Sequence, residues 1–174
     1  MGLIRTMNTL MTFPITSSNF APFGWLASGE NFGNAQVRPI NDGTSLRLDD
    51  CGELSLTALD GQACLALFRA QARDLTQPCL SLERHRLGTQ TFIPMGGVRY
   101  VMLVARGDTE PDVATLTAFL VKGHQAVTLR ADTWHHGLIA LDAGDFMVIE
   151  RHSNVLDCEV ATLKQSVYLS GLLP

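Results

Sequence analysis

The sequence lacks the features that mark several common classes of protein. Its 13 lysines and arginines are scattered without a basic run, and the net charge is -4, so nucleic acid is not an expected partner. The longest apolar stretches, such as VRYVMLVA, are strand-sized, whereas a membrane helix needs roughly 20 residues. Residues 1–16 contain no continuous apolar segment followed by a cleavage site. We therefore expect a cytoplasmic protein without a membrane span.

Cysteine is present, but without the spacing that metal sites and redox pairs use. No C-x-x-C pair occurs among the four cysteines, and their neighbours are mostly apolar. We therefore expect Cys51, Cys64, Cys79 and Cys158 to be buried free thiols.

The composition is typical of a folded globular chain. Hydrophobic residues make up 46% and charged residues 17%, which is too apolar for a disordered chain. The 174 residues suffice for one sizeable core, and no repeat or linker divides them. We expect a loose N-terminal extension over residues 1–15 and a single domain over residues 16–174.

The second half of the chain predicts a series of short strands. The predicted strands are rich in Val, Ile, Phe and Thr, and glycine, proline and aspartate separate them where turns need these residues. They cover residues 91–95, 98–105, 115–121, 126–134, 137–141 and 146–151. This spacing predicts a mainly all-β fold, an antiparallel barrel or sandwich with a few short helices.

The first half is less regular. Ser17 or Ser18 could cap a short helix. Residues 53–70 read as a strand hairpin around an Asp-Gly turn. The polar, turn-prone stretch PINDGTSLRLDD is expected near a surface or at the mouth of the barrel.

Residues 81–94, SLERHRLGTQTFIP, contain the first candidate site. Side chains alternate between the two faces of a strand, so Glu83 and His85 share one face while Arg84 and Arg86 share the other. On its own, a Glu-x-His pair on a strand is more often an exposed polar surface than a site. The mouth of a small barrel, where polar groups converge on a ligand, favours a site here.

Gln90 follows His85 at an odd offset, so an unbroken strand would direct its side chain away from His85. Gly88 lies between them and can supply the bend that returns Gln90 to the same face.

A second candidate lies in residues 130–138, RADTWHHGL. His135 and His136 are adjacent, so only one of them can face the interior of the barrel. Spacing within the stretch does not say which. We expect His124 and His152, in a turn and at a strand end, to be exposed.

Together these two stretches resemble the cupin pattern, in which histidines and an acidic residue converge inside a barrel. The corresponding positions here are Glu83, His85, Gln90 and His135. Glu83 replaces the first histidine of that pattern, and Gln90 replaces the acid. A metal site made of these four residues would therefore be weaker or differently selective than a three-histidine site, and the resemblance favours His135 over His136.

A closer resemblance is to the ureidoglycolate lyase family. The motifs LERHRLGTQTFIPM, RGDTEPDVATLTAFLVKGHQAV, DTWHHGL and DFMVIER occur in the order of that family over about residues 81–151. Weaker blocks, FAPFG, INDGTSLR and LFRAQ, precede them. The resemblance thus extends from about Phe20 onward.

This resemblance implies a cupin fold, a homodimer, and release of urea from ureidoglycolate to give glyoxylate in purine and allantoin breakdown. In that elimination a base takes the hydroxyl proton and an acid protonates the departing ureido nitrogen. Histidine suits either role because its pKa lies near neutral pH. We therefore expect His85, His135, Gln90 and Glu83 to be catalytic, or to hold a divalent metal such as nickel. Whether a metal is bound remains open.

The substrate carboxylate needs a cationic cradle, which a guanidinium supplies. Arg47 and Arg69 are the candidates because each lies in a block that resembles the family, and Asn41 is a further candidate at the mouth. Gly96 and Gly137 stand where family members often have larger residues or proline. These two departures could alter substrate preference.

Two other functions remain open from the sequence. A non-catalytic cupin that binds or senses a small carboxylate such as glyoxylate would need a cationic cradle but no pair of proton-transfer groups. A metal-dependent isomerase or oxygenase is less consistent with glutamine at position 90.

Overall fold

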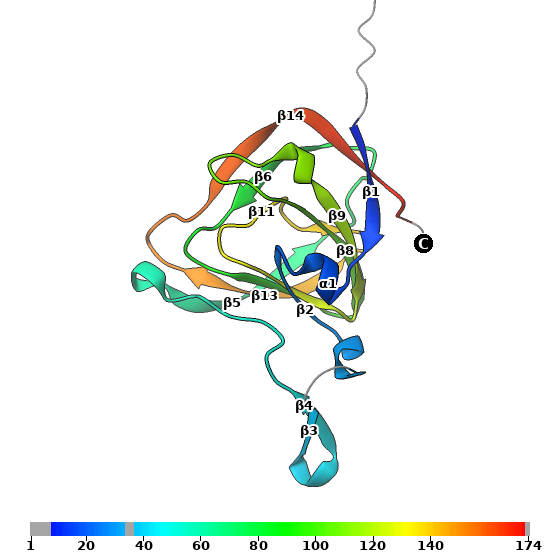
Figure 1. Ribbon diagram of the computed structural model, residues 1–174, viewed down its shortest axis with the longest axis vertical. Coiled ribbons are helices and arrows are strands. Elements are labelled where there is room, and N and C mark those ends of the chain that lie inside the picture. The colour runs from blue at the N-terminus through cyan, green and yellow to red at the C-terminus, as the bar shows by residue number, and fades with distance from the viewer. Residues whose placement is uncertain (1–7, 34–36, 173–174) are drawn as a thin grey trace, which may run out of the picture.

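The computed structural model describes residues 8–33 and 37–172, and strands dominate it (Figure 1). The strands form a seven-stranded sheet, a five-stranded sheet and a two-stranded hairpin. No helix within these ranges is long and apolar enough to cross a membrane. The strands are β1 (Asn8–Pro14), β2 (Gly24–Ala27), β3 (Val37–Ile40), β4 (Ser45–Leu48), β5 (Gln62–Ala70), β6 (Cys79–Arg84), β7 (Gln90–Pro94), β8 (Gly97–Ala105), β9 (Thr117–Gly123), β10 (Ala126–Leu129), β11 (Trp134–His135), β12 (Ile139–Ala140), β13 (Gly144–His152) and β14 (Glu159–Ser170).

The short strand β11 closes the larger sheet into a barrel. It pairs with β6 on one side and with β8 on the other, which completes a ring of β11, β6, β14, β1, β9 and β8. Strand β1 runs parallel to both β14 and β9, whereas the other pairs are antiparallel. The prediction of a mainly all-β barrel is confirmed, and β1 makes the barrel mixed.

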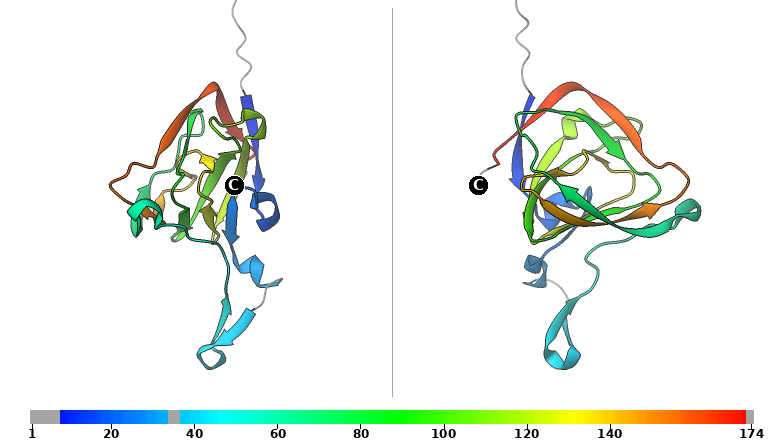
Figure 2. Two further views of the ribbon diagram at one scale, coloured as in Figure 1. Left: turned by 60° about the vertical axis from the view of Figure 1, so that its left-hand side comes forward. Right: turned by 180° about the vertical axis from the view of Figure 1, so that it is seen from behind.

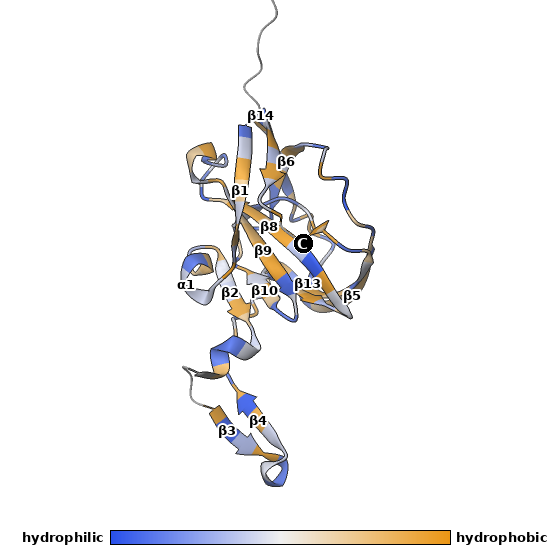
Figure 3. Ribbon diagram, turned by 90° about the vertical axis from the view of Figure 1, so that its right-hand side faces the viewer, coloured by the Kyte–Doolittle hydropathy of each residue, from blue (hydrophilic) through white to orange (hydrophobic). Residues whose placement is uncertain are grey.

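The core lies on both sides of β8. Its even-numbered residues from Val98 to Val104 pack with aromatic side chains from the five-stranded sheet, for example Tyr100 against Phe146. Its odd-numbered residues from Val101 to Ala105 pack into a second cluster inside the barrel. Figure 3 shows the corresponding apolar colouring of β8 and β9. A strand buried on both faces reads as a continuous apolar run, which explains VRYVMLVA.

The five-stranded sheet has the order β2-β10-β7-β13-β5. Its longest pairing joins β13 to β5 over nine residues, from Gly144 with Ala70 to His152 with Gln62. The strands predicted over residues 91–105 and 115–151 correspond to β7–β13. The expected strand at 126–134 is divided, because Asp132 adopts a positive φ of 68° in the turn between β10 and β11.

The first half differs from the sequence-based prediction in where its hairpin lies. Residues 52–57 form no strand, so the hairpin predicted over 53–70 is wrong and only β5 forms there. The hairpin is instead β3–β4, whose turn at Asn41, Asp42 and Gly43 has three successive positive φ angles. Asparagine, aspartate and glycine tolerate that conformation best. The hairpin extends away from the barrel in every view (Figures 1 and 2).

The N-terminal segment also differs from expectation. Residues 8–14, expected to be part of a loose extension, form β1, which is held between β14 and β9. Residues 1–7 of that expected extension lie outside the described residues. A short helix, α1 (Ser17–Phe20), follows; its N-cap is Thr16 and not Ser17 or Ser18. The other short helices are the 3-10 turns η1 (Gly29–Gly33), η2 (Asn41–Gly43), η3 (Ala58–Asp60) and η4 (Val113–Thr115).

Candidate active site

The strand that closes the barrel also assembles the site. His135 on β11 lies directly opposite Glu83 on β6, and the distance from His135 Nε2 to Glu83 Oε1 is 3.6 Å. His85 follows the end of β6, and its ring centroid lies 5.5 Å from that of His135. One potential ligand atom from each of Glu83, His85 and His135 lies within 4.8 Å of the others. The structure thus brings together three of the four residues named from the cupin pattern.

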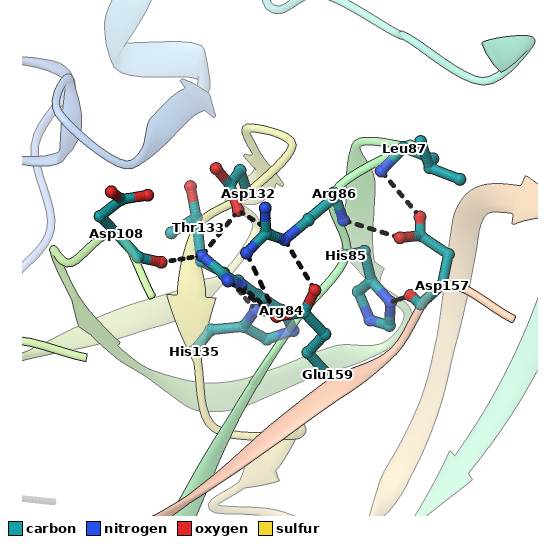
Figure 4. Close-up of polar contacts among 10 residues, drawn as sticks. All are labelled: Arg84, His85, Arg86, Leu87, Asp108, Asp132, Thr133, His135, Asp157 and Glu159. Carbon is teal, nitrogen blue, oxygen red and sulfur yellow. Dashed lines mark hydrogen bonds and ion pairs between the residues drawn. The ribbon is translucent and has the colours of Figure 1, made fainter. Parts of the chain in front are cut away.

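Backbone carbonyls fix the orientation of both imidazole rings. His135 Nδ1 lies 2.9 Å from the carbonyl oxygen of Thr133, and His85 Nδ1 lies 2.5 Å from that of Asp157 (Figure 4). Because a carbonyl oxygen only accepts, each Nδ1 carries the proton, and in a neutral ring Nε2 then presents its lone pair. Both Nε2 atoms are buried, and neither has a hydrogen-bond partner.

The charge state of His135 explains why this arrangement favours a cation. Burial lowers the pKa of His135 to about 4, so the ring is neutral at pH 7 and its contact with Glu83 is not an ion pair there. The Nε2 lone pair of His135 therefore lies beside the carboxylate of Glu83, and a ring nitrogen of His85 lies within 4.8 Å of both. Imidazole and carboxylate ligands of this kind bind divalent transition metals. Histidines that bind metals also usually donate their other ring N–H to a carbonyl, carboxylate or water, as both of these do.

Arg84 lies on the opposite face of β6, as the alternation predicts. Its guanidinium is fully buried and donates to Glu159 Oε2 at 2.7 and 2.9 Å. It also contacts Asp132 Oδ1 at 3.0 Å and the carbonyl oxygen of Asp108, and it lies over the ring of Trp134. Figure 4 shows the contacts of Arg84 with Asp108, Asp132 and Glu159 beside His85 and His135. Arg84 therefore braces β6 against β11 and is not available to a substrate.

A pocket of about 200 Å³ adjoins the site, and His85 and Gln90 both line it. Gln90 Nε2 donates to Glu150 Oε2 at 2.8 Å, which fixes the amide so that its Oε1 is the atom left without a partner. Cys158 also lines the pocket, and its Sγ lies 3.8 Å from Glu83 Oε2. The full lining is His85, Gly88, Thr89, Gln90, Glu150, Arg151, His152, Ser153, Val155, Leu156, Asp157 and Cys158.

Gly88 occupies the bend between β6 and β7, as expected for the residue that returns Gln90 to the site. A Cβ added at Gly88 would lie 2.6 Å from Arg151 Cβ, so a larger residue would displace this wall of the pocket. Gly137 also lies near the site: a Cβ there would meet Glu83 Oε1 at 3.6 Å. Gly96 adopts a positive φ of 71° in the turn between β7 and β8.

His136 is not among the three residues whose potential ligand atoms converge. Its Nδ1 lies 2.8 Å from the carbonyl oxygen of Gly137. His124 and His152 are exposed, as predicted, although His152 also lines the pocket.

The four cysteines are free thiols, as predicted, but the expected burial holds only for Cys79. The other three are partly exposed.

The structure does not bring the predicted carboxylate-binding residues to the pocket within this chain. Arg47 lies on the projecting hairpin and pairs with Asp49 Oδ1 at 2.6 Å, and Asn41 forms the tip of that hairpin. Arg69 lies at the far end of β5 from the pocket and forms a bidentate pair with Asp145. For Arg47 and Asn41, a turn-rich block in the sequence does not show which way a projecting hairpin extends.

Sequence reasoning missed several residues of the pocket. Glu150 and Arg151 lie on β13, and Asp157 and Cys158 lie just before β14. Each is 60 or more positions from His85 in the sequence. No local pattern signals these contacts, which arise only when the two sheets assemble.

Comparison with known proteins gives a consistent match over nearly the whole chain. A family model described as ureidoglycolate lyase matches residues 7–170. The ureidoglycolate lyase of Burkholderia mallei is 37% identical over 166 residues, which is 94% of this chain and 95% of the relative. That of Burkholderia cepacia is 37% identical over 153 residues, covering 86% and 84%. That of Brucella anthropi is 34% identical over 146 residues, covering 83% and 84%.

Proposed function

The chain belongs to the ureidoglycolate lyase family, and on this premise we propose that it is a carbon–nitrogen lyase that releases urea from ureidoglycolate to give glyoxylate. The observation that carries this proposal is the centre of Glu83, His85 and His135 beside a polar pocket. A pocket of this size fits a small hydroxy acid. The reaction would serve allantoin and purine breakdown in the cytoplasm.

We propose that Glu83, His85 and His135 hold one divalent cation such as nickel. The residues fit such an ion because two buried imidazole nitrogens without partners face a carboxylate. When bound, the ion would polarise the oxygens of the substrate and stabilise negative charge on them. We propose that Gln90 binds the substrate and is not a metal ligand, because its amide is held by Glu150.

Glu83 is the member of the centre best placed to move a proton. Its side chain is 32% exposed, whereas that of His135 is 2% exposed. Oε1 of Glu83 faces His135, and Oε2 lies beside Cys158 on the pocket wall. We assign to Oε2 the removal of the hydroxyl proton of the substrate. The carbonyl of glyoxylate then forms, the carbon–nitrogen bond breaks, and the same proton passes to the departing nitrogen to give urea.

One group can make both transfers because the hydroxyl oxygen and the ureido nitrogen are bonded to the same carbon. The neutral ring of His135 has no proton to give at Nε2, so it serves as a ligand and not as the acid.

Two other residues of the pocket match the remaining groups of the substrate. Arg151 lines the pocket, and its Nε and Nη2 donate to the carbonyl oxygens of Ala58 and Leu59 at 2.8 and 3.0 Å, which fix the position of the guanidinium. A guanidinium held in place binds a carboxylate with little loss of side-chain freedom. Gln90 Oε1 can accept a ureido N–H, because the Nε2 of that amide is committed to Glu150. Arg151 therefore replaces Arg47 and Arg69 as the proposed carboxylate anchor.

Incubation of the purified protein with ureidoglycolate tests the function directly. We expect equal amounts of glyoxylate and urea, above a control without protein. A chelator should remove the activity, and nickel or manganese should restore it, since the centre needs a cation between its lone pairs. Absence of turnover with every metal would contradict the lyase function. Binding of glyoxylate under those conditions would instead support a non-catalytic carboxylate sensor.

Full activity after exhaustive chelation, with no metal found by elemental analysis, would contradict the metal site while leaving the lyase function intact.

We further propose that the protein forms a homodimer through the free edge of β5. This strand lies at the end of its sheet, and its first seven residues, QACLALF, carry no charge. Leu65 and Leu67 are 64% and 57% exposed. Proteins usually protect such an edge with charges or proline, or cover it. An antiparallel pair of identical edges is two-fold symmetric, as dimers require.

The double substitution Leu65→Lys and Leu67→Lys should convert the dimer to a monomer, measured by size-exclusion chromatography with light scattering. Lysine adds charge to both copies at the point where the two edges would meet. Val113→Lys, at a residue 55% exposed outside β5, is the matched control and should leave the dimer intact. A dimer that persists in the double variant would place the interface elsewhere.

A further inference from the structure

Asp157 makes three contacts with the turn that follows β6. Its Oδ1 accepts from Arg86 N at 2.8 Å, and its Oδ2 accepts from Leu87 N at 2.9 Å. Its main-chain oxygen lies 2.5 Å from His85 Nδ1. Figure 4 shows the side chain of Asp157 directed at this turn. One residue therefore contacts both the backbone of the turn and the imidazole that the turn carries.

We propose that Asp157 is a positioning residue for the lyase reaction, which holds His85 in the tautomer and orientation that the centre requires. This inference rests on the proposed function. The Nδ1–H of His85 is donated to the Asp157 carbonyl, so the lone pair of Nε2 is left for the centre. A partner of this kind fixes the ring of a metal-binding histidine.

The location of His85 explains why it needs such a partner. Strand β6 ends at Arg84, so His85 lies beyond the hydrogen-bonded ladder. Its carbonyl oxygen accepts from Asp132 N at 2.6 Å, which anchors the main chain but leaves the ring free to turn. The three contacts of Asp157 supply the restraint on the ring and on the two residues that follow it.

The arginine of this turn pairs with other carboxylates, which leaves the carboxylate of Asp157 free for this role. Arg86 lies in this turn, and its Nε pairs with Glu159 Oε1 at 2.7 Å. The same Nε lies 3.8 Å from Asp132 Oδ1. The carboxylate of Asp157 is thus used by backbone N–H groups. An aspartate that accepts two successive N–H groups fixes the geometry of a turn, as the side chains of Asx motifs do.

Two variants separate positioning from folding. Asp157→Ala removes both carboxylate contacts, and Asp157→Asn keeps one acceptor while placing an NH₂ group against the second N–H. Asp142→Asn is the matched control: Asp142 also accepts a backbone N–H, that of Arg99 at 3.1 Å, and pairs with an arginine. Asp142 lies next to β12, away from the pocket lining.

The measurements are turnover of ureidoglycolate and the ring ¹⁵N signals of His85 in the full-length protein. We expect Asp157→Ala to lower kcat by roughly 10–100-fold, the usual cost of losing an outer partner of a ligand, with a smaller change in KM. For Asp157→Asn we expect a kcat between that of the wild type and that of Asp157→Ala. Both variants keep the main-chain oxygen of Asp157 but weaken the two carboxylate contacts that hold the turn against it. The ring of His85 should therefore shift from that oxygen and lose its uniform Nδ1–H tautomer, a change that a general loss of stability would not produce. Asp142→Asn should retain kcat and the wild-type signals of His85.

An unchanged Nδ1–H signal in Asp157→Ala together with wild-type kcat would overturn the inference. So would an equal loss of kcat in Asp142→Asn. If the wild-type protein fails to turn over ureidoglycolate, the proposed function fails, but the ring signals still decide whether Asp157 sets the tautomer of His85. Should Asp157→Ala not fold, the same signals in Asp157→Asn make that decision.

Discussion

Replacement of His135 by alanine should abolish turnover in a protein that still folds, whereas His136→Ala should have a mild effect. His135 Nε2 lies 3.6 Å from Glu83 Oε1, while His136 is not among the three residues whose ligand atoms converge, and its Nδ1 contacts the carbonyl of Gly137. Loss of a residue of the centre itself should exceed the roughly 10–100-fold cost of losing an outer partner. Steady-state kinetics and bound metal, measured on both variants, provide the comparison.

The two variants form a matched pair because the residues are adjacent. His135→Ala leaves the Thr133 carbonyl without its donor, at a cost of about 1–3 kcal/mol in stability, so thermal unfolding must accompany the kinetics. His135→Gln supplies a variant of closer size if the alanine variant unfolds. Equal losses of kcat in His135→Ala and His136→Ala, both folded, would show that the faces of the pair are assigned wrongly.

Glu83→Gln should reduce kcat by roughly 10²–10⁴-fold, the contribution of a positioned acid–base group. The amide has nearly the shape of the carboxylate but cannot take the hydroxyl proton at Oε2. KM should change less, because Arg151 and Gln90, the proposed substrate-binding residues of the pocket lining, are unchanged. Steady-state kinetics with glyoxylate detection measures the effect, and metal content shows whether the amide still supports the ion.

Glu110→Gln is the control for that variant, since Glu110 is exposed and lies outside the pocket of the site. A Glu83→Gln enzyme with near wild-type kcat would exclude Glu83 as the group that moves the proton. The role would then pass to a residue of the pocket wall, of which Glu150 is the nearest in chemistry.

The alternation of side chains along strands was sufficient to predict many of the strands and to place Glu83 and His85 together. Alternation placed Glu83 and His85 on one side of the chain and Arg84 on the other, although β6 itself ends at Arg84. Gly88 was recognisable as a residue that can supply a bend between His85 and Gln90, and the structure adds its close approach to Arg151. The apolar run that became β8 was predictable because a strand buried on both faces has no polar alternation.

Other parts could not be read from local pattern because they depend on pairing over long separations. Strand β1 is parallel to β14, with Asn8 opposite Val167, and nothing near either strand signals the other. Asp157 and Glu150 look like ordinary loop and strand carboxylates until the sheets assemble. The hairpin was misplaced because the Asp-Gly pair at 60–61 looks like a turn, whereas Asn41, Asp42 and Gly43 form one.

The pairing of β1 with β14 has a consequence for how the protein is made. Strand β14 (Glu159–Ser170) emerges from the ribosome after the other five strands of the ring, and it also borders β6, whose Glu83 opposes His135. The nascent chain must therefore keep the edge of β1 that pairs with β14 open until β14 has been synthesised. Strands of this kind are exposed to misassembly during translation, so the interval before β14 joins the ring is when the chain most needs chaperone protection.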